Sequence, residues 1–290
     1  MLEGSYTAIV TPFLNGNIDE VAFKKLIDRQ IEAKITGIVP CGTTGESPTL
    51  SFDEHKKIID LTVKHVEKRA QVIAGAGSNS TLEAIELARS AKTSGADAIL
   101  VITPYYNKPT QQGLYLHFKK MAEEVDIPIV LYNVPGRTGV DLGVDTVVRL
   151  AEIPGIVAIK EASGSISRAS DIINKTDIAV VSGDDSLAYS MVTVGGKGVI
   201  SVSSNVFPEM VAKMIKYSLN GDLQSGLKLH NKLFGINNKL FVETNPIPVK
   251  AALAMMGLIR EEYRLPLCKI SDKNKAVLQE ELNKFEEFKA

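Results

Sequence analysis

Eight short runs of apolar, mostly β-branched residues recur along the chain, and a longer segment with helical signals separates each run from the next. The runs occupy residues 8–10, 37–39, 72–74, 98–101, 129–132, 156–159, 179–181 and 198–200. They are apolar throughout instead of alternating with polar residues, which is the pattern of parallel strands buried on both faces. This alternation of strands and helices predicts an α/β fold, a (β/α)8 TIM barrel.

The segments that follow the runs favour the barrel over a doubly wound sheet. Eight strand–helix units spread over about 220 residues, which is within the size range of the (β/α)8 barrel. A doubly wound sheet usually carries a glycine-rich phosphate-binding turn after its first strand, whereas the first run here leads into Thr-Pro-Phe at residues 11–13. Between the runs, residues 51–54 and 80–83 both fit the capping box that begins a helix.

The strand-like runs stop near residue 222, and helical patterns replace them. These helical patterns cover residues 223–240, 249–256 and 273–288. Pro246 and Pro248 break the pattern between the first two of them. We expect residues 1–221 to form the catalytic barrel and residues 222–290 to form a C-terminal helical domain packed on it.

Composition and charge exclude several classes of function. The formal net charge is -1 and the sequence pI is about 6.5, so no basic surface points to nucleic acid or to an anionic membrane. Two cysteines are too few for a disulfide framework, and the first residues lack the basic and apolar regions of a signal peptide. No apolar run approaches the roughly 18 residues of a membrane span. We expect a cytoplasmic protein.

Reactive side chains follow the predicted strands, where a (β/α)8 barrel carries its active site. Lys160 directly follows the sixth run, so its amine is expected at the mouth of an apolar barrel. Burial there favours the neutral amine, which can attack a ketone and form an imine. Tyr132 ends the neighbouring fifth run, and its phenol could transfer protons during that reaction. Taken singly, such a lysine more often extends to solvent, and such a tyrosine is often a core residue with a bonded hydroxyl.

Two loops offer groups that bind carboxylates. Residues 42–45 (Gly-Thr-Thr-Gly) follow the second run with two hydroxyls and flexible backbone N–H groups, a turn that suits a small carboxylate. Arg137 lies in a Pro-Gly-Arg-Thr-Gly loop after the fifth run, and its guanidinium could hold a second carboxylate through two hydrogen bonds. In isolation each feature is more often an ordinary turn or a solvated arginine.

The sequence predicts no metal site and no cofactor. The four histidines are scattered over predicted helices without metal-ligand spacing. Asp184 and Asp185 follow the seventh run and could bind Mg²⁺, but no further ligand supports such a site. Cys41 has no histidine on a neighbouring strand end, so we interpret it as a buried structural thiol.

Three motifs, in order and at barrel spacing, give the chain a specific resemblance. They are Gly42-Thr43-Thr44-Gly45-Glu46, Tyr132-Asn133-Val134-Pro135-Gly136-Arg137-Thr138-Gly139 and Lys160-Glu161. With them the chain resembles the dihydrodipicolinate synthase family, which belongs to the N-acetylneuraminate lyase superfamily. The resemblance runs nearly end to end, through Asn245-Pro246-Ile247-Pro248-Val249-Lys250 in the helical tail. It implies a class I aldolase that condenses pyruvate with L-aspartate 4-semialdehyde to give 4-hydroxy-tetrahydrodipicolinate, on the pathway to diaminopimelate and lysine.

The resemblance also implies a catalytic set. Lys160 would form the Schiff base with pyruvate. Thr43, Tyr106 and Tyr132 would form a proton relay, in which the neighbouring subunit donates Tyr106. The usual assembly of the family is a homotetramer built as a dimer of tight dimers.

A second set of positions would bind the substrates. Thr44, with Thr43, would hold the pyruvate carboxylate, and Arg137 would bind the carboxylate of aspartate semialdehyde. Gly183 and Ile200 match positions whose backbone lines the pocket.

Three functions remain open at this point. The first is the condensation just described, and the second is a related aldolase that cleaves a 2-keto sugar acid to pyruvate. Arg137 favours the first, because sugar-acid aldolases generally lack the Pro-Gly-Arg-Thr-Gly loop and tend to carry Ser at the position of Thr43. The third is a regulatory or structural barrel without activity, which predicts the loss of reactive residues that are all present here.

The resemblance finally implies regulation by free lysine at the tight-dimer interface. The matching positions are Ser47, Pro48, Phe52, His55, Asn79, Glu83 and Tyr105. Strongly inhibited members often carry histidine at the position of Phe52 and alanine at that of Pro48. Because Phe52 cannot donate a hydrogen bond, we expect lysine to inhibit weakly and incompletely.

Overall fold

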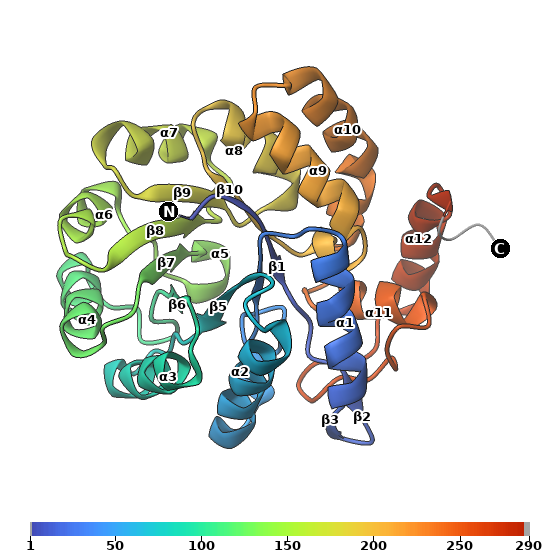
Figure 1. The fold of residues 1–290 in the computed structure, drawn as a ribbon, viewed down its shortest axis with the longest axis horizontal. Helices are drawn as coiled ribbons and strands as arrows, with labels where there is room; N and C mark the ends of the chain where they lie inside the picture. The colour runs from blue at the N-terminus through green and yellow to red at the C-terminus, as the bar shows by residue number, and fades with distance from the viewer. Residues whose placement is uncertain (1, 287–290) are drawn as a thin grey trace.

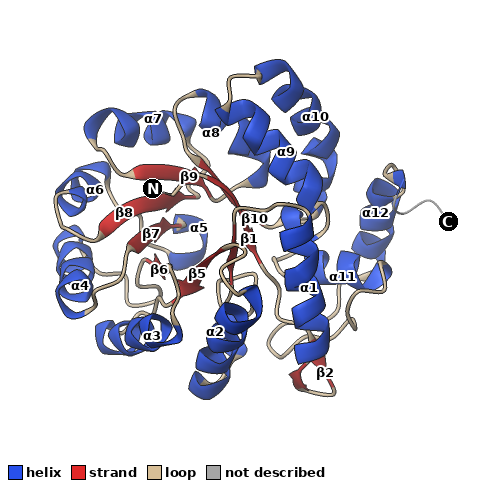
Figure 2. Ribbon diagram, viewed as in Figure 1, coloured by secondary structure: helices blue, strands red, loops and turns tan. Residues whose placement is uncertain are grey.

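A closed barrel of eight parallel strands forms the centre of the computed structural model, which describes residues 2–286. The barrel strands are β1 (Gly4–Ala8), β4 (Gly37–Val39), β5 (Gln71–Gly75), β6 (Ala98–Ile102), β7 (Ile129–Asn133), β8 (Ile156–Glu161), β9 (Ala179–Ser182) and β10 (Gly198–Ser201). Each strand pairs with the next one along the chain, and β1 closes the ring against β10. Figures 1 and 2 show the strands at the centre and the helices around them. The predicted (β/α)8 fold is confirmed.

One helix follows each barrel strand and covers the outside of the barrel. These helices are α1 (Glu20–Glu32), α2 (Phe52–Val66), α3 (Thr81–Ser94), α4 (Gln111–Glu124), α6 (Val144–Ala151), α7 (Ile166–Lys175), α8 (Ala188–Thr193) and α9 (Pro208–Leu219). Ser51 and Glu54 form the predicted capping box at the start of α2. Ser80 caps α3, but the Glu83 carboxylate accepts a hydrogen bond from the Ser78 hydroxyl at 2.7 Å, so the second box is only half formed.

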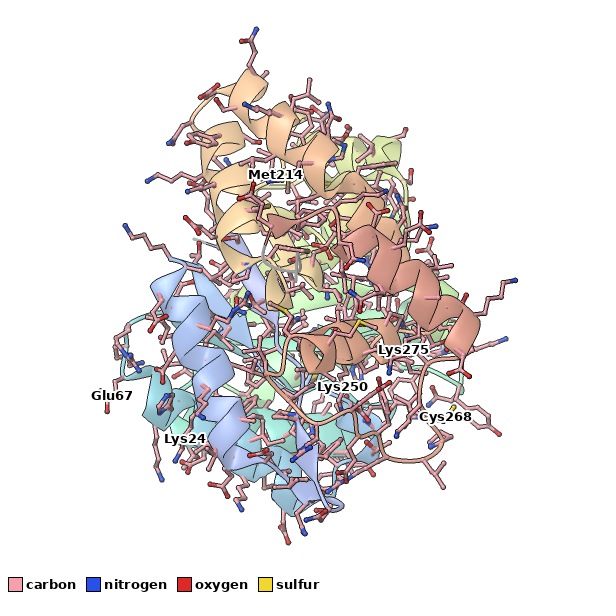
Figure 3. The ribbon with its side chains drawn as sticks, turned by 90° about the vertical axis from the view of Figure 1, so that its right-hand side faces the viewer. Lys24, Glu67, Met214, Lys250, Cys268 and Lys275 are labelled. Atoms are coloured by element: carbon pink, nitrogen blue, oxygen red, sulfur yellow. The ribbon has the colours of Figure 1, made fainter. Side chains whose placement is uncertain are left out.

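Three helices follow the barrel: α10 (Leu223–Lys239), α11 (Ile247–Met255) and α12 (Asp272–Leu282). Helix α10 packs against α8 and α9, and α12 packs against α10 and α11. Figure 3 views the molecule from this side, with Lys250 on α11 and Lys275 on α12 labelled. Helix α11 begins earlier than predicted because its first turn tolerates Pro248.

The last predicted helix is shorter than expected. Its predicted range extends to Phe288, whereas α12 ends at Leu282, and residues 287–290 lie outside the described part of the chain. The proposed boundary at residues 221 and 222 falls between α9 and α10, and the division into two domains stays a prediction. Within residues 2–286, no helix is both long and apolar enough to cross a membrane.

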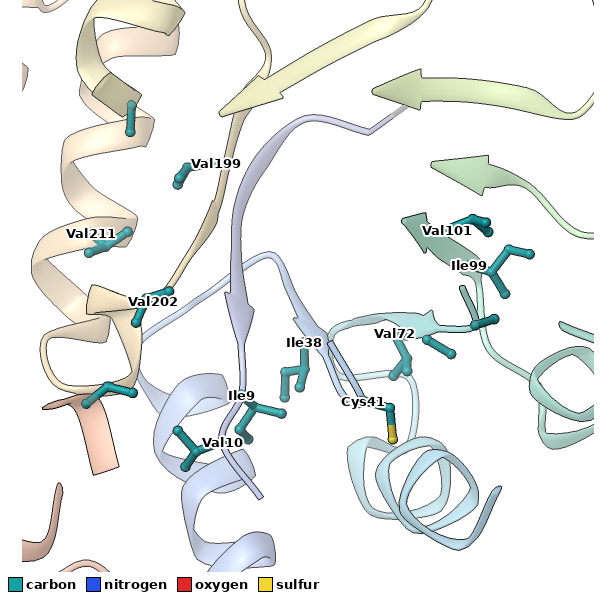
Figure 4. Packing of buried hydrophobic residues seen from close by; sticks show 14 of the residues in the cluster. Ile9, Val10, Ile38, Cys41, Val72, Ile99, Val101, Val199, Val202 and Val211 are labelled. Carbon is teal, nitrogen blue, oxygen red and sulfur yellow. The ribbon is translucent and has the colours of Figure 1, made fainter. Parts of the chain in front are cut away.

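Strand side chains alternate between two apolar layers. One layer fills the inside of the barrel and includes Tyr6, Leu100 and Val181. The other layer lies between the strands and the surrounding helices, and Figure 4 shows part of it, with Val199 of β10 and Val211 of α9. Because both faces of the strands are buried, the strands read as continuous apolar runs in the sequence.

The beginning of the chain differs from the prediction. The first strand lies at Gly4–Ala8 instead of residues 8–10. Tyr6 and Thr7 are fully buried there, and their hydroxyls donate to glutamine side chains of other segments at 2.8 and 2.7 Å. A strand rich in buried polar residues does not appear as an apolar run. A small hairpin of β2 (Phe13–Leu14) and β3 (Asn17–Ile18) follows, which the apolar runs do not predict either.

Candidate active site

Lys160 and Tyr132 lie opposite each other near the carboxyl ends of the adjacent strands β8 and β7. Lys160 is 6 % exposed, and its Nζ lies 4.2 Å from the centre of the Tyr132 ring. The two residues are paired in the parallel register, so both side chains point to the same face of the sheet, the inside of the barrel. An amine and a phenol therefore meet at the barrel mouth, as the sequence predicts.

Gly183 lets the Lys160 side chain pass close to the backbone that follows β9. Its N–H donates to the Glu161 carbonyl at 2.8 Å, which continues the β8–β9 pairing. A Cβ at this position would lie 2.7 Å from the Ala162 Cβ and 3.0 Å from the Lys160 Cε. Because carbon atoms in contact normally lie about 3.5–4.0 Å apart, only glycine fits without a shift. Gly183 therefore helps to set where the Lys160 amine lies.

A buried polar network holds the strand ends behind Lys160. Glu161 is 1 % exposed, and its carboxylate accepts from the Ser163 N–H at 2.8 Å and the Arg168 Nε at 2.9 Å. Asn133, on β7, donates to the same carboxylate and accepts from the Leu142 N–H at 3.0 Å. Since these bonds join the ends of β7 and β8 to the loops beyond them, they restrain the strand positions that carry the site.

The loop after β4 presents Thr43 and Thr44 to the same region. The loop is a tight turn, in which the Gly45 and Glu46 N–H groups donate to the Gly42 and Thr43 carbonyls, both at 3.1 Å. It passes directly over the end of β5, where a Cβ on Gly75 would lie 2.1 Å from the Cys41 carbonyl oxygen. Glycine at position 75 is therefore required for this loop path.

Arg137 lies on the short helix α5 (Pro135–Thr138), which follows β7. Its side chain reaches the C-terminal segment, where Nη2 donates to the Asn245 carbonyl at 3.2 Å. Asn245 in turn donates its side-chain amide to the Thr44 hydroxyl at 3.0 Å. The two predicted carboxylate-binding groups are thus joined through Asn245, a contact that no local sequence pattern could have indicated.

One cavity of about 390 Å³ brings most of the predicted residues together. Its lining includes Thr43, Thr44, Tyr132, Arg137, Lys160 and Gly183, with Asn237, Asn238, Phe241 and Asn245 from the C-terminal segment. The volume is at the small end of the range for ligand pockets, which suits a small substrate. Ile200, also predicted, does not line it: its side chain is fully buried in the barrel interior.

Tyr106 does not line this cavity in the described chain. It is 89 % exposed, with a backbone φ of 72°, in the loop after β6. A large aromatic residue that is almost fully exposed, in a left-handed conformation that side chains rarely adopt, is typical of an interface or functional position.

A second cavity, also of about 390 Å³, lies next to the first and shares Thr43, Tyr132 and Arg137 with it. Six of the predicted lysine-site residues line it: Ser47, Pro48, Phe52, His55, Glu83 and Tyr105. Asn79 does not, but its side-chain amide donates to the Tyr105 carbonyl at 3.2 Å. His55 Nε2 lies 2.7 Å from the Gly75 carbonyl, and burial lowers the pKa of its imidazole.

Asp185, a candidate metal ligand, and Cys41, a candidate nucleophile, both have structural partners. Asp185 is buried, and its carboxylate accepts from the Ser201 hydroxyl and the Val202 N–H. Cys41 is 3 % exposed, and burial raises the pKa of its thiol. Among residues 2–286, no three His, Cys, Asp or Glu side chains are grouped in a way that could hold a metal ion.

The sequence and the fold of this chain both match known proteins. The model of the dihydrodipicolinate synthetase family matches residues 1–285. The 4-hydroxy-tetrahydrodipicolinate synthase of Thermodesulfovibrio yellowstonii is 54 % identical over 284 residues, which cover 97 % of this chain and 98 % of that protein. The dihydrodipicolinate synthase of Acinetobacter baumannii, solved in complex with pyruvate, is 48 % identical with a TM-score of 0.96 over 98 % of each chain. The enzyme of Cyanidioschyzon merolae, solved with lysine bound, is 38 % identical with a TM-score of 0.93 over 97 % of each chain.

Proposed function

The chain belongs to the dihydrodipicolinate synthetase family, and from this premise we propose that Lys160 is the nucleophile of its reaction. The chain is a lyase that condenses pyruvate with L-aspartate 4-semialdehyde to 4-hydroxy-tetrahydrodipicolinate, in diaminopimelate and lysine biosynthesis. The observation that carries the proposal is the pairing of Lys160 with Tyr132, 4.2 Å from Nζ to the ring centre, in a cavity that Thr44 and Arg137 also line.

The chemistry begins with pyruvate. The Lys160 amine adds to the ketone carbon, and loss of water from the carbinolamine gives the imine. Water can leave only after the former ketone oxygen has gained a proton, and the Tyr132 hydroxyl would supply it. Thr43 lies at the same cavity wall and would extend the relay, while Thr44 would hold the pyruvate carboxylate.

The second substrate then reacts with the enamine. Loss of a proton from the pyruvate methyl group gives the enamine, whose carbon attacks the aldehyde carbon of aspartate semialdehyde. The aldehyde oxygen takes a proton and remains as the hydroxyl of the product. The amino group of the second substrate displaces Lys160 from the imine carbon, which closes the ring and frees the lysine. Arg137, at the cavity mouth, would bind the carboxylate of this substrate.

We propose that the site is completed by a second copy of the chain, in a homotetramer built from tight dimers. The support is the exposure of Tyr106, which leaves it free to reach a partner's site near Thr43. Aromatic residues are also more frequent in the cores of protein interfaces than on the rest of the protein surface. A monomeric form is therefore expected to be nearly inactive.

We also propose that free lysine binds in the second cavity. The carboxylate of Glu83 would pair with a ligand ammonium group, while Asn79 and Tyr105 would hold the ligand carboxylate. The relative from Cyanidioschyzon merolae that was solved with lysine bound supports the ligand. Because the cavity shares Thr43 and Tyr132 with the active site, an occupant would act directly on the relay.

Turnover of two substrate sets tests the proposal. Purified protein is expected to consume pyruvate and aspartate semialdehyde together, and to cleave 2-keto sugar acids poorly because Arg137 is suited to a carboxylate instead of a polyol. Preferential cleavage of a sugar acid would overturn the assignment.

We propose that the enzyme acts in the cytoplasm. The free thiols of Cys41 and Cys268 support this location.

A further inference from the structure

A buried ion pair joins the loop that carries Thr43 and Thr44 to the C-terminal helices. Lys250, on α11, contacts the Glu46 carboxylate through a short hydrogen bond, and both side chains are fully buried. The two residues are 204 positions apart in the sequence. Figure 3 labels Lys250 beside helix α11.

The surroundings of the pair are built to hold the ammonium in place. The Lys250 Nζ lies 4.3 Å from the centre of the Phe13 ring and 5.1 Å from that of the Tyr263 ring. Both rings therefore make cation–π contacts with the ammonium group. The Tyr263 hydroxyl donates to the Ile247 carbonyl at 2.9 Å, which fixes that ring on the first turn of α11. Burial lowers the pKa of the Lys250 amine, and the neighbouring carboxylate of Glu46 opposes this shift.

A second ion pair extends the same connection. Arg264 donates to both oxygens of Glu54 on α2, at 2.6 and 2.7 Å, and to the Thr49 carbonyl at 3.0 Å. Its backbone N–H lies 3.5 Å from the Glu46 carboxylate. The segment from Glu46 to Glu54 is thus attached at both ends to residues beyond the barrel.

Stability alone is a weak explanation for such a pair. Removing two charges from water offsets most of their attraction, and apolar side chains of similar volume often stabilise a core as well or better. What a buried ion pair does well is to require one arrangement, because any other leaves an unpaired charge. Here that arrangement brackets the Thr44–Asn245 hydrogen bond: Glu46 follows Thr44 on one side, and Lys250 follows Asn245 on the other.

We propose that Glu46 and Lys250 are positioning residues that set the distance between the Thr43–Thr44 turn and Lys160, and so control the binding of pyruvate. The proposal rests on the proposed function, since it assumes that this turn holds the pyruvate carboxylate. It gives the C-terminal helices a role in catalysis, although Lys160 and Tyr132 both lie on barrel strands. The backbone of Glu46 is consistent with it, because its φ of 54° is uncommon for a non-glycine residue and its buried contacts help to hold it.

Borohydride trapping of pyruvate on the purified full-length protein tests the proposal without the second substrate. In the double variant Glu46→Met/Lys250→Met, the apolar pair should preserve the fold while the restraint on the turn is lost. The pyruvate concentration for half-maximal trapping should then rise about tenfold or more, because displacements below 1 Å already affect reactive geometry strongly. Glu46→Gln keeps an oxygen acceptor for Lys250 but not the negative charge. This variant should raise the pyruvate concentration for half-maximal trapping about threefold.

Lys275→Met provides the matched control. Lys275 forms an ion pair of 2.7 Å with Glu261 in the same C-terminal segment, and its side chain is 40 % exposed, unlike the fully buried Lys250. The half-saturating pyruvate concentration of Lys275→Met should stay within about twofold of that of wild type. Unchanged half-saturation in Glu46→Gln and the double variant, or an equal rise in Lys275→Met, would overturn the role of the pair. Absence of trapping in wild type would instead refute the proposed function.

Discussion

One methyl group added at Gly183 is expected to displace the reactive lysine. In Gly183→Ala the new Cβ would lie 2.7 Å from the Ala162 Cβ and 3.0 Å from the Lys160 Cε. Relative to ordinary carbon contacts, these distances are short by about 0.5–1 Å, and the lysine methylenes are the more mobile neighbour. Overpacking of this size costs about 1–3 kcal/mol of stability, and a shift of 1 Å in a reacting group can reduce its rate about a hundredfold.

The rate of borohydride trapping at saturating pyruvate measures this displacement. Gly183→Ala should trap pyruvate roughly ten- to a hundredfold more slowly than wild type, while its Tm falls by only a few degrees. Gly113→Ala, on α4, is the control: its new Cβ would meet the Pro109 Cβ at 3.2 Å, far from the site, and trapping should be unchanged. If Gly183→Ala traps pyruvate as fast as wild type, the contact with Gly183 does not set the position of Lys160.

Three further predictions concern the second substrate, acid stability and inhibition. Arg137→Ala should lower kcat/KM for aspartate semialdehyde about a hundredfold and leave pyruvate trapping intact; lost trapping would mean that the two carboxylate sites are wrongly assigned. The Arg264 guanidinium lowers the pKa of Glu54 to about 2, so its contribution, at most about 3 kcal/mol, should be present above about pH 4.5 and lost as the pH falls through 2. Urea unfolding of wild type and Glu54→Gln should therefore differ at pH 7 and converge near pH 2. Millimolar lysine should inhibit wild type weakly and Phe52→His more strongly; no inhibition of either would leave the second cavity without a regulatory role.

The barrel could be predicted because each of its strands leaves a local pattern in the sequence. Strands such as Ile129–Asn133 are buried on both faces, so they stand out as apolar runs against the amphipathic helices around them. Strand order then follows chain order, which puts the residues after each strand at one end of the barrel. For this reason Lys160, Tyr132 and Arg137 could be placed in one cavity before any distance was known.

Features that depend on distant partners could not be predicted in this way. Tyr6 and Thr7 form a buried strand only because glutamines from other segments bond their hydroxyls. Asn245 reaches Thr44 across 201 positions of sequence, and no spacing rule marks such a contact. The β2–β3 hairpin is different. Its turn is Asn-Gly at residues 15–16, both with positive φ, and this dipeptide is a local hairpin signal even though the two short strands form no apolar run.

We propose that Lys160 itself forms the imine with pyruvate. Borohydride reduction in the presence of pyruvate, followed by digestion and mass spectrometry, identifies the modified residue directly. We predict one adduct, on the peptide that contains Lys160, with the added mass of pyruvate less one oxygen atom. Lys160→Arg should give no adduct, because guanidinium stays protonated. An adduct on a different lysine, or full turnover by Lys160→Arg, would contradict the account.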